Sequence, residues 1–115
     1  MDAKWPQANR SLSKLIVGYR KEAPEIAGAF SSLAKGAIKP GALDSKTKEL
    51  MALAVGIAAR CDGCIGFHTE AAIKYGATRE EIVETIGVAI YMGGGPSYVY
   101  GAQVLEAFDQ LAKAG

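Results

Sequence analysis

Apolar residues recur along this chain every three or four positions, which is the spacing of one face of an α-helix. No stretch of useful length alternates apolar and polar residues, so the pattern predicts no β-strand. Glycines, prolines and N-capping residues divide the chain, and together they predict an all-α fold of about six helices. The signals that bound these helices are, in chain order, Ser11 to Tyr19, Pro24 to Lys39-Pro40-Gly41, Asp44 or Ser45 to about Arg60, Asp62 to Gly76, Thr78-Arg79-Glu80-Glu81 to Gly93, and Pro96 to Ala112.

The third predicted helix has no polar side. Every residue from Leu50 to Ala59 is apolar or glycine, and a helix that is apolar all round must be covered all round. Five other helices hardly suffice to surround it, so we expect the chain to associate with copies of itself. The alternative is a central helix wrapped entirely by its own chain.

The length of 115 residues suits one domain. We assign residues 1–115 to a single domain, with residues 1–10 as an extended polar leader whose Trp5 docks on a neighbour or is disordered.

The net charge of +1 argues against a nucleic-acid-binding protein. Residues 1–48 carry nine Lys or Arg against four Asp or Glu, and residues 49–115 carry four against eight. The simplest interpretation of this uneven charge is two differently solvated faces. The other is electrostatic complementarity between the two halves of the chain or between subunits.

No apolar run approaches the roughly 20 residues that a membrane-spanning helix needs, and no signal peptide is visible. We therefore expect a cytoplasmic protein without a membrane partner. In a reducing compartment, a cysteine pair is more often redox-active or metal-binding than a structural bridge. The two cysteines and the one histidine of this chain, Cys61, Cys64 and His68, fall within eight residues.

Cys61-Asp62-Gly63-Cys64 is a C-x-x-C motif at the start of a predicted helix, and His68 lies one turn after Cys64 on the same face. A thiolate is the reactive form of cysteine, and a helix N-terminus or a nearby base favours it. A second cysteine can convert a sulfenic acid into a disulfide. Three interpretations remain open, of which the spacing favours the first: a redox dithiol, a metal site with Glu49 as a fourth ligand, or small buried residues beside an incidental histidine.

A longer pattern surrounds this motif. Glu49 is followed by eleven residues, the Cys61-x-x-Cys64 pair, three residues and His68. Over roughly residues 25–110, the chain resembles the alkylhydroperoxidase D-like proteins of the carboxymuconolactone decarboxylase superfamily. It resembles the thiol-bearing branch, because the decarboxylases proper lack the cysteine pair.

The resemblance implies an oligomeric all-α protein, a trimer or hexamer, that acts as a thiol-dependent peroxidase or disulfide oxidoreductase. It implies that Cys64 attacks the hydroperoxide and that Cys61 then forms a disulfide with it. His68 would take the thiol proton, and Glu49 would relay protons to His68. From helix position alone, Cys61 is the better-stabilised thiolate. The hydroperoxidase that names the family has a histidine between its cysteines, where this chain has Gly63. General dithiol–disulfide exchange does not need that histidine.

The resemblance implies no metal and no organic cofactor. An external dithiol such as lipoamide, or a thioredoxin-like protein, would restore the pair, and a peroxiredoxin or dithiol carrier would be the protein partner. Two alternatives stay open: a carboxymuconolactone decarboxylase-type lyase, in which the thiols would have no purpose, and a non-enzymatic metal-binding or redox-sensing oligomer. The role of Glu49 rests on the resemblance alone, since it lies about 18 Å from Cys61 along a straight helix.

Overall fold

The computed structural model describes residues 3–114, and all regular secondary structure in this range is α-helical. The predicted fold class is confirmed. The helices are α1 (Lys4–Glu22), α2 (Pro24–Ile38), α3 (Ser45–Ala58), α4 (Asp62–Lys74), α5 (Arg79–Gly93) and α6 (Gly95–Ala114).

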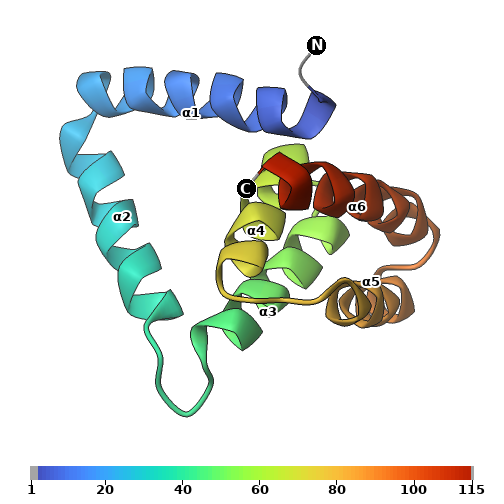
Figure 1. Ribbon diagram of the computed structural model, residues 1–115. Helices are drawn as coiled ribbons and strands as arrows, with labels where there is room; N and C mark the ends of the chain where they lie inside the picture. The colour runs from blue at the N-terminus through green and yellow to red at the C-terminus, as the bar shows by residue number, and fades with distance from the viewer. Residues whose placement is uncertain (1–2, 115) are drawn as a thin grey trace.

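Helices α3 to α6 form the body of the molecule. α4 packs against α3 and α6, and α5 packs against the same two helices from the other side (Figure 1). The core between them is aliphatic, and its largest fully buried apolar side chains are Leu53, Ile57, Ile65, Ile82 and Val104. Ile82 and Val104 come from faces that a helical period predicts, whereas α3, which is apolar all round, gives no such signal for Leu53 and Ile57.

The signals between α4, α5 and α6 act as predicted. Thr78 begins α5 with a capping box, in which Thr78 and Glu81 each hold the backbone N–H of the other. Gly76 follows α4 with a positive φ of 90°, and Gly94 separates α5 from α6 with a φ of 74°. Glycine adopts this left-handed conformation without the steric cost of a Cβ, so these two positions set the turns between helices.

Helices α1 and α2 form an arm, which we define as residues 4–38. Figure 1 shows α1 passing over one end of the body and α2 turning away from it before the chain returns at α3. No residue of α2 is buried. The large apolar residues of these two helices are mostly exposed, namely Leu15, Ile16, Val17, Tyr19, Ile26, Phe30 and Leu33.

The prediction of an extended leader over residues 1–10 is wrong for its described part, because α1 already begins at Lys4 rather than after Ser11. Residues 1–2 lie outside the described range. Trp5 is 4% exposed, and its indole Nε1–H donates to Glu106 Oε1 at 2.9 Å. Its neighbours on this turn are mostly polar and face solvent, so a single buried aromatic residue left no periodic signal.

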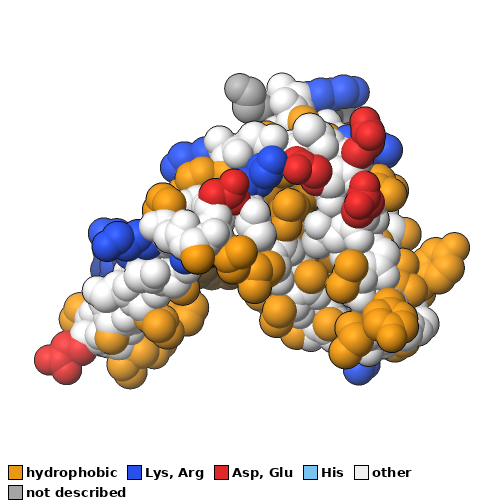
Figure 2. All heavy atoms as spheres, turned by 90° about the horizontal axis from the view of Figure 1, so that it is seen from below, with side chains coloured by type: hydrophobic (Ala, Val, Ile, Leu, Met, Phe, Trp, Pro, Cys, Tyr) orange, Lys and Arg blue, Asp and Glu red, His pale blue; other side chains and the backbone are white. Residues whose placement is uncertain are grey.

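The all-apolar helix α3 is covered by its own chain on one side only. Leu53 and Ile57 are fully buried, whereas Met51 and Val55 are 52% and 68% exposed. The alternative of a helix wrapped entirely within one subunit is therefore wrong. Figure 2 shows that hydrophobic side chains cover much of the underside of both the arm and the body. None of the helices described is both long enough and apolar enough to cross a membrane.

Candidate active site

A tight turn folds α4 back along α3. α3 ends at Ala58, Arg60 has a positive φ of 57°, and the Cys61 N–H donates to the Gly56 carbonyl at 3.0 Å. A left-handed residue reverses the chain direction within few positions. As a result, α4 begins at Asp62 beside the last turn of α3, and the two parts of the sequence motif lie on neighbouring helices.

Cys61 caps the N-terminus of α4. Its backbone is extended, and its Sγ accepts the Cys64 N–H at 3.2 Å. Its carbonyl accepts the Ile65 N–H at 3.0 Å. An N-cap side chain in this position satisfies one of the free N–H groups of the first turn. The sulfur of Cys61 therefore lies at the positive end of the helix dipole.

Cys61 and Cys64 form a disulfide, with their Cα atoms 5.2 Å apart. Both residues are half-buried. Within residues 3–114, no group of three or more His, Cys, Asp and Glu side chains is arranged to hold a metal ion. The geometry thus brings the two sulfurs together as a pair that can exchange electrons with an external thiol.

Glu49 and His68 meet between α3 and α4. Glu49 Oε1 lies 2.7 Å from His68 Nδ1, and Glu49 is 6% exposed while the His68 side chain is 35% exposed. A carboxylate can only accept a hydrogen bond. Beside a Glu49 carboxylate, the Nδ1–H of His68 is therefore the donor, and in the neutral imidazole Nε2 is then the nitrogen that can accept a hydrogen bond.

The tight turn between α3 and α4 explains why a straight helix placed Glu49 about 18 Å from the cysteines. Each residue of α4 after Asp62 steps about 1.5 Å back alongside α3. His68 is thereby carried back toward Glu49, and two long side chains span the remaining gap. The sequence analysis brought Cys61, Cys64 and His68 together on one helix turn, but only the fold adds Glu49 to them.

Gly56 sets the distance between α3 and Cys64. A Cβ added to Gly56 would stand 2.8 Å from Cys64 Cβ, which is shorter than carbon atoms approach in packed interiors. The lack of a side chain at Gly56 therefore lets α3 lie directly against Cys64. In the sequence, Gly56 is one of ten consecutive apolar or glycine residues, and nothing there distinguishes it from its neighbours.

Helix α1 supports the other side of α4. The Asn9 side chain is buried and its Nδ2–H donates to the Gly66 carbonyl at 3.0 Å. A Cβ on Gly63 would stand 2.6 Å from a methyl group of Leu12. Sequence analysis missed Asn9, since one buried amide in a polar segment has no pattern that distinguishes it. The two glycines inside the C-x-x-C helix were the available signal that another element packs closely there.

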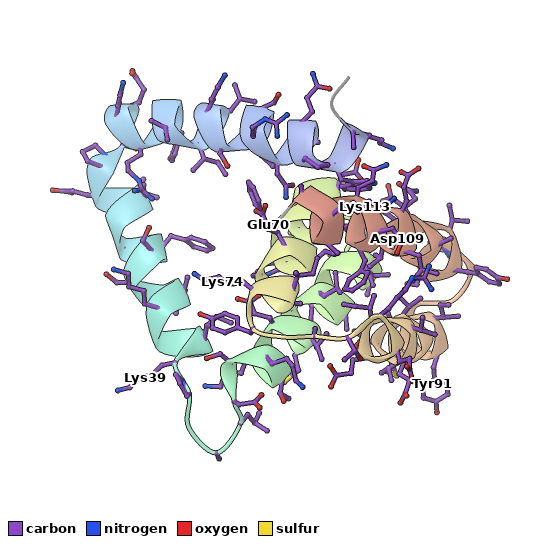
Figure 3. All side chains as sticks on the ribbon, viewed as in Figure 1. Lys39, Glu70, Lys74, Tyr91, Asp109 and Lys113 are labelled. Atoms are coloured by element: carbon purple, nitrogen blue, oxygen red, sulfur yellow. A yellow bond between two sulfur atoms is a disulfide. The ribbon has the colours of Figure 1, made fainter. Side chains whose placement is uncertain are left out.

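The buried Glu49 borders a cleft of about 330 Å³ between the end of α2 and the start of α3. Lys48 Nζ donates to the Lys39 carbonyl beside it. Figure 3 shows Lys39 at the end of α2, and Lys74 extending from α4 toward the arm. The residues that line the cleft are Ala34, Lys35, Ile38, Lys39, Pro40, Ser45, Glu49 and Tyr75.

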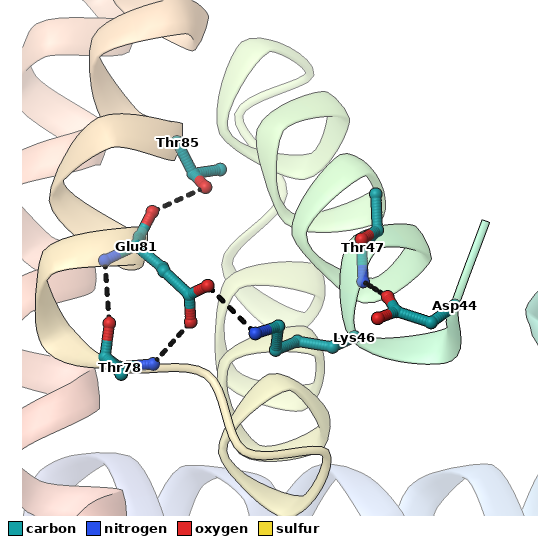
Figure 4. A network of polar contacts seen from close by, with 6 residues as sticks. All are labelled: Asp44, Lys46, Thr47, Thr78, Glu81 and Thr85. Atoms are coloured by element: carbon teal, nitrogen blue, oxygen red, sulfur yellow. Dashed lines mark hydrogen bonds and ion pairs between the residues drawn. The ribbon is translucent and has the colours of Figure 1, made fainter.

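The first turn of α3, which precedes Glu49, is held by a polar network (Figure 4). Asp44 caps α3 by accepting the Thr47 N–H at 2.7 Å. Lys46 Nζ donates to Glu81 Oε2 at 2.9 Å. The Thr78 N–H and then Lys46 hold the pKa of Glu81 below its usual value. Because Glu81 belongs to the capping box of α5, this ion pair joins the starts of two helices and steadies the segment that positions Glu49.

The model of the carboxymuconolactone decarboxylase family matches residues 24–107. The chain belongs to this family. The resemblance seen in the sequence is thus confirmed at the level of the superfamily. The match covers the arm helix α2 and the whole body up to the middle of α6, including Glu49, Cys61, Cys64 and His68.

Two solved structures of family members have the same fold. A carboxymuconolactone decarboxylase family protein from Legionella pneumophila, described in its apo form, is 50% identical with a TM-score of 0.91, over 94% of this chain and 96% of that one. A family protein from Thermotoga maritima, described in connection with an antioxidative response, is 30% identical with a TM-score of 0.79, over 96% and 92% of the two chains. An uncharacterised protein of Cupriavidus necator is 40% identical over 88 residues, which are 76% of this chain and 78% of its own.

Proposed function

We propose that this carboxymuconolactone decarboxylase family protein is a thiol-dependent oxidoreductase that reduces organic hydroperoxides or disulfides through Cys61 and Cys64. The observation that carries the proposal is the buried Glu49–His68 contact, which lies one helical turn from Cys64. The description of the Thermotoga maritima relative in connection with an antioxidative response supports the same class of chemistry.

The proposal gives each of these side chains a task. Glu49 holds the Nδ1–H of His68, so His68 Nε2 accepts the proton of the Cys64 thiol across one turn of α4. The resulting thiolate is the nucleophile. The negative charge of Glu49 stabilises the imidazolium that forms.

The proposed cycle balances with one external reductant. The Cys64 thiolate attacks the outer oxygen of ROOH, the O–O bond breaks, and Cys64 sulfenic acid and ROH form once the leaving alkoxide takes a proton. The Cys61 thiolate then attacks the Cys64 sulfur, which releases water and forms the disulfide. A dithiol supplies two electrons, reopens the disulfide and becomes a disulfide itself.

We propose that the electrons come from outside the chain. Lipoamide is a suitable dithiol, and a thioredoxin-like protein, a peroxiredoxin or another dithiol carrier would be the matching protein partner. None of the proposed steps needs a metal ion or an organic cofactor, because sulfur and a proton relay perform them all.

The experiment that tests the function is hydroperoxide-dependent oxidation of several dithiols by the wild type, Cys61→Ser and Cys64→Ser. We expect multiple turnovers from the wild type and none from Cys64→Ser. From Cys61→Ser we expect Cys64 sulfenic acid that no internal thiol resolves, and turnover slower than that of the wild type because the dithiol must reduce this sulfenic acid directly. Equal rates in all three proteins would refute the proposal. A wild type that oxidises once but never turns over would indicate the redox-sensing alternative.

We propose in addition that the protein is a homo-oligomer. The exposed apolar residues of α2 belong to a helix of 15 residues with no buried position, and isolated helices of that length are marginal in water. The arm carries six Lys or Arg against two Glu, whereas the rest of the chain is acidic, so the arm of one copy complements the body of another.

Light scattering tests this assembly. We expect a mass above that of one chain for the wild type and for Ser32→Glu, a control on another side of α2. Phe30→Glu, which places a charge on a side chain that is 68% exposed, should lower the mass toward that of the monomer. A wild type of monomeric mass at micromolar concentration would exclude the oligomer.

A further inference from the structure

The cleft between the end of α2 and the start of α3 is held open by hydrogen bonds across it. Its volume of about 330 Å³ lies in the lower part of the range of small-molecule sites. The Ser45 Oγ–H donates to the Ile38 carbonyl at 2.8 Å, and Lys48 Nζ donates to the Lys39 carbonyl at 2.5 Å. These two bonds join the end of α2 to the first turn of α3, so they set the separation of the two walls.

Positive charge gathers at this cleft. Lys35 and Lys39 line it, and both are exposed. Within residues 3–114, no acidic side chain pairs with the Nζ atom of either lysine. Glu49 is the one acid among the described residues that line the cleft, and its carboxylate already contacts His68. A cleft lined by charges of one sign concentrates the field and attracts an ion of the opposite sign, so this cleft suits an anion.

The other lining residues indicate what the anion is attached to. Ala34, Ile38 and Pro40 are apolar, and Tyr75 adds an aromatic ring whose hydroxyl can donate a hydrogen bond to an anion. Lys74 Nζ lies 5.9 Å from the centroid of that ring and adds a further positive charge. A lysine ammonium binds an anionic group as a point charge. The cleft therefore suits the acid end of a ligand whose remaining part is apolar.

One stripe of α4 connects this cleft to the cysteine pair. Cys64, His68, Ala71 and Tyr75 follow one another at intervals of three or four positions, so they lie on one face of the helix. Each of the four is half-buried or exposed. Tyr75 lies eleven residues after Cys64, which is about 16 Å along a helix. A ligand whose acid group lies in the cleft therefore needs a chain of about that length to bring a reactive group to Cys64.

We propose that the cleft is a carboxylate-binding subsite and that the substrate is a long-chain hydroperoxide with an acid group, such as a fatty-acid hydroperoxide. Lys35 and Lys39 bind the carboxylate, the apolar chain lies along the α4 stripe past His68, and the hydroperoxide group reaches Cys64. The subsite binds the substrate and takes no part in electron transfer. The choice of substrate rests on the proposed function, whereas the subsite binds the acid whether or not a hydroperoxide is reduced.

The cleft and the proposed contact between copies use different sides of α2. The contact between copies uses the side that carries Phe30. Lys35 follows Phe30 by five positions, which is about 140° around the helix. A homo-oligomer formed through Phe30 therefore does not need to cover the cleft.

Calorimetric titration with laurate, a fatty acid without a reactive group, tests the subsite. The variant combines Lys35→Gln with Lys39→Gln. The control combines Lys14→Gln with Lys21→Gln, which removes the same charge from exposed positions of α1. We expect the dissociation constant to rise roughly 2- to 30-fold in the variant, the effect of losing two lysine–carboxylate contacts near a surface, and to keep the wild-type value in the control. Equal affinity in all three proteins, or no binding to the wild type, would overturn the subsite.

Alkylation of the reduced protein by iodoacetamide tests the path of the chain. Saturating laurate should slow the alkylation of Cys64, whereas acetate, which has the acid group but no chain, should leave the rate unchanged. Mass spectrometry of the modified protein follows both reactions. Laurate that binds without protecting Cys64 would overturn the path along α4.

Turnover with dihydrolipoamide as the reductant separates this inference from the proposed function. The variant with Lys35→Gln and Lys39→Gln should lose more kcat/KM for linoleate hydroperoxide than for cumene hydroperoxide, which is neutral and has no chain to span the distance. An equal loss for both substrates would overturn the choice of substrate. If neither hydroperoxide is reduced by the wild type while laurate binds as expected, the peroxidase function alone is contradicted and the subsite stands.

Discussion

The Glu49 carboxylate lies 2.7 Å from Nδ1 of His68, although the two residues are 19 positions apart and belong to different helices. Glu49 is almost completely buried, and a buried carboxylate is costly unless its hydrogen bonds are satisfied. The contact therefore serves the fold and the proposed chemistry together, because the bond that satisfies Glu49 also leaves His68 Nε2 free to accept a proton.

Glu49→Gln should slow turnover while leaving the fold intact. The amide has nearly the same shape and can still accept the His68 N–H, but it lacks the charge that stabilises the imidazolium. We expect kcat/KM to fall by roughly 10- to 100-fold, by analogy with the loss when the hydrogen-bond partner of a metal-ligating histidine is changed. The measurement is the hydroperoxide and dithiol assay on both proteins.

Glu84→Gln is the matched control, since Glu84 is an exposed carboxylate on α5. It should retain the wild-type rate. Full activity in Glu49→Gln would remove Glu49 from the proton relay and leave its contact with His68 purely structural.

Gly56→Ala should disturb the cysteine pair. The new methyl group would stand 2.8 Å from Cys64 Cβ, so α3 and α4 must separate or the Cys64 side chain must move. Overpacking of this kind costs typically about 1–3 kcal/mol. Urea denaturation measures the loss, and the rate of disulfide reduction by a dithiol shows whether the site has changed.

Gly87→Ala provides the comparison for this substitution. Gly87 lies in α5 with open space around it, so the alanine should stabilise the protein by about 0.5–1 kcal/mol through helix propensity alone. If Gly56→Ala also stabilised the protein, close packing against Cys64 could not be the reason for a glycine at position 56.

Asn9→Ala should loosen the attachment of α1 to the body. The substitution removes the donor to the Gly66 carbonyl and leaves a cavity beside α4. A lost buried side-chain hydrogen bond of this type costs about 1–3 kcal/mol. Thermal or urea denaturation measures this loss of stability. Gln7→Ala is the control, because Gln7 is exposed on the same helix. Equal stability of the two variants would show that the Asn9 hydrogen bond contributes little.

The stability of the protein should decrease in acid partly through Glu81. Hydrogen bonding by the Thr78 N–H, followed by that of Lys46, lowers the pKa of Glu81 from its usual 4.5. A carboxyl whose pKa is lower in the folded state contributes stability above its unfolded pKa and loses it as the pH falls through the folded value. The urea midpoint should therefore decline below about pH 4.5, and decline less in Glu81→Gln. An identical pH profile in that variant would exclude the contribution.

The sequence by itself determined the helical architecture and the local half of the site. Helix periodicity, the Thr78 capping box and Gly76 located the body helices, because these signals depend on neighbours within a few residues. The C-x-x-C spacing placed Cys61, Cys64 and His68 together for the same reason, since positions three and four apart share a helix face.

Only the tertiary structure decided which residues from other helices join them. Glu49 reaches His68 because the turn at Arg60 folds α4 back along α3. The residues next to Glu49 and to His68 in the sequence do not predict that these two helices lie side by side. Trp5 and Asn9 are buried by α4 and α6, which lie far away in the sequence, so their polar surroundings suggested an exposed leader. Long-range packing of this kind depends on the shapes of whole helices, and a one-dimensional pattern of apolar residues does not record it.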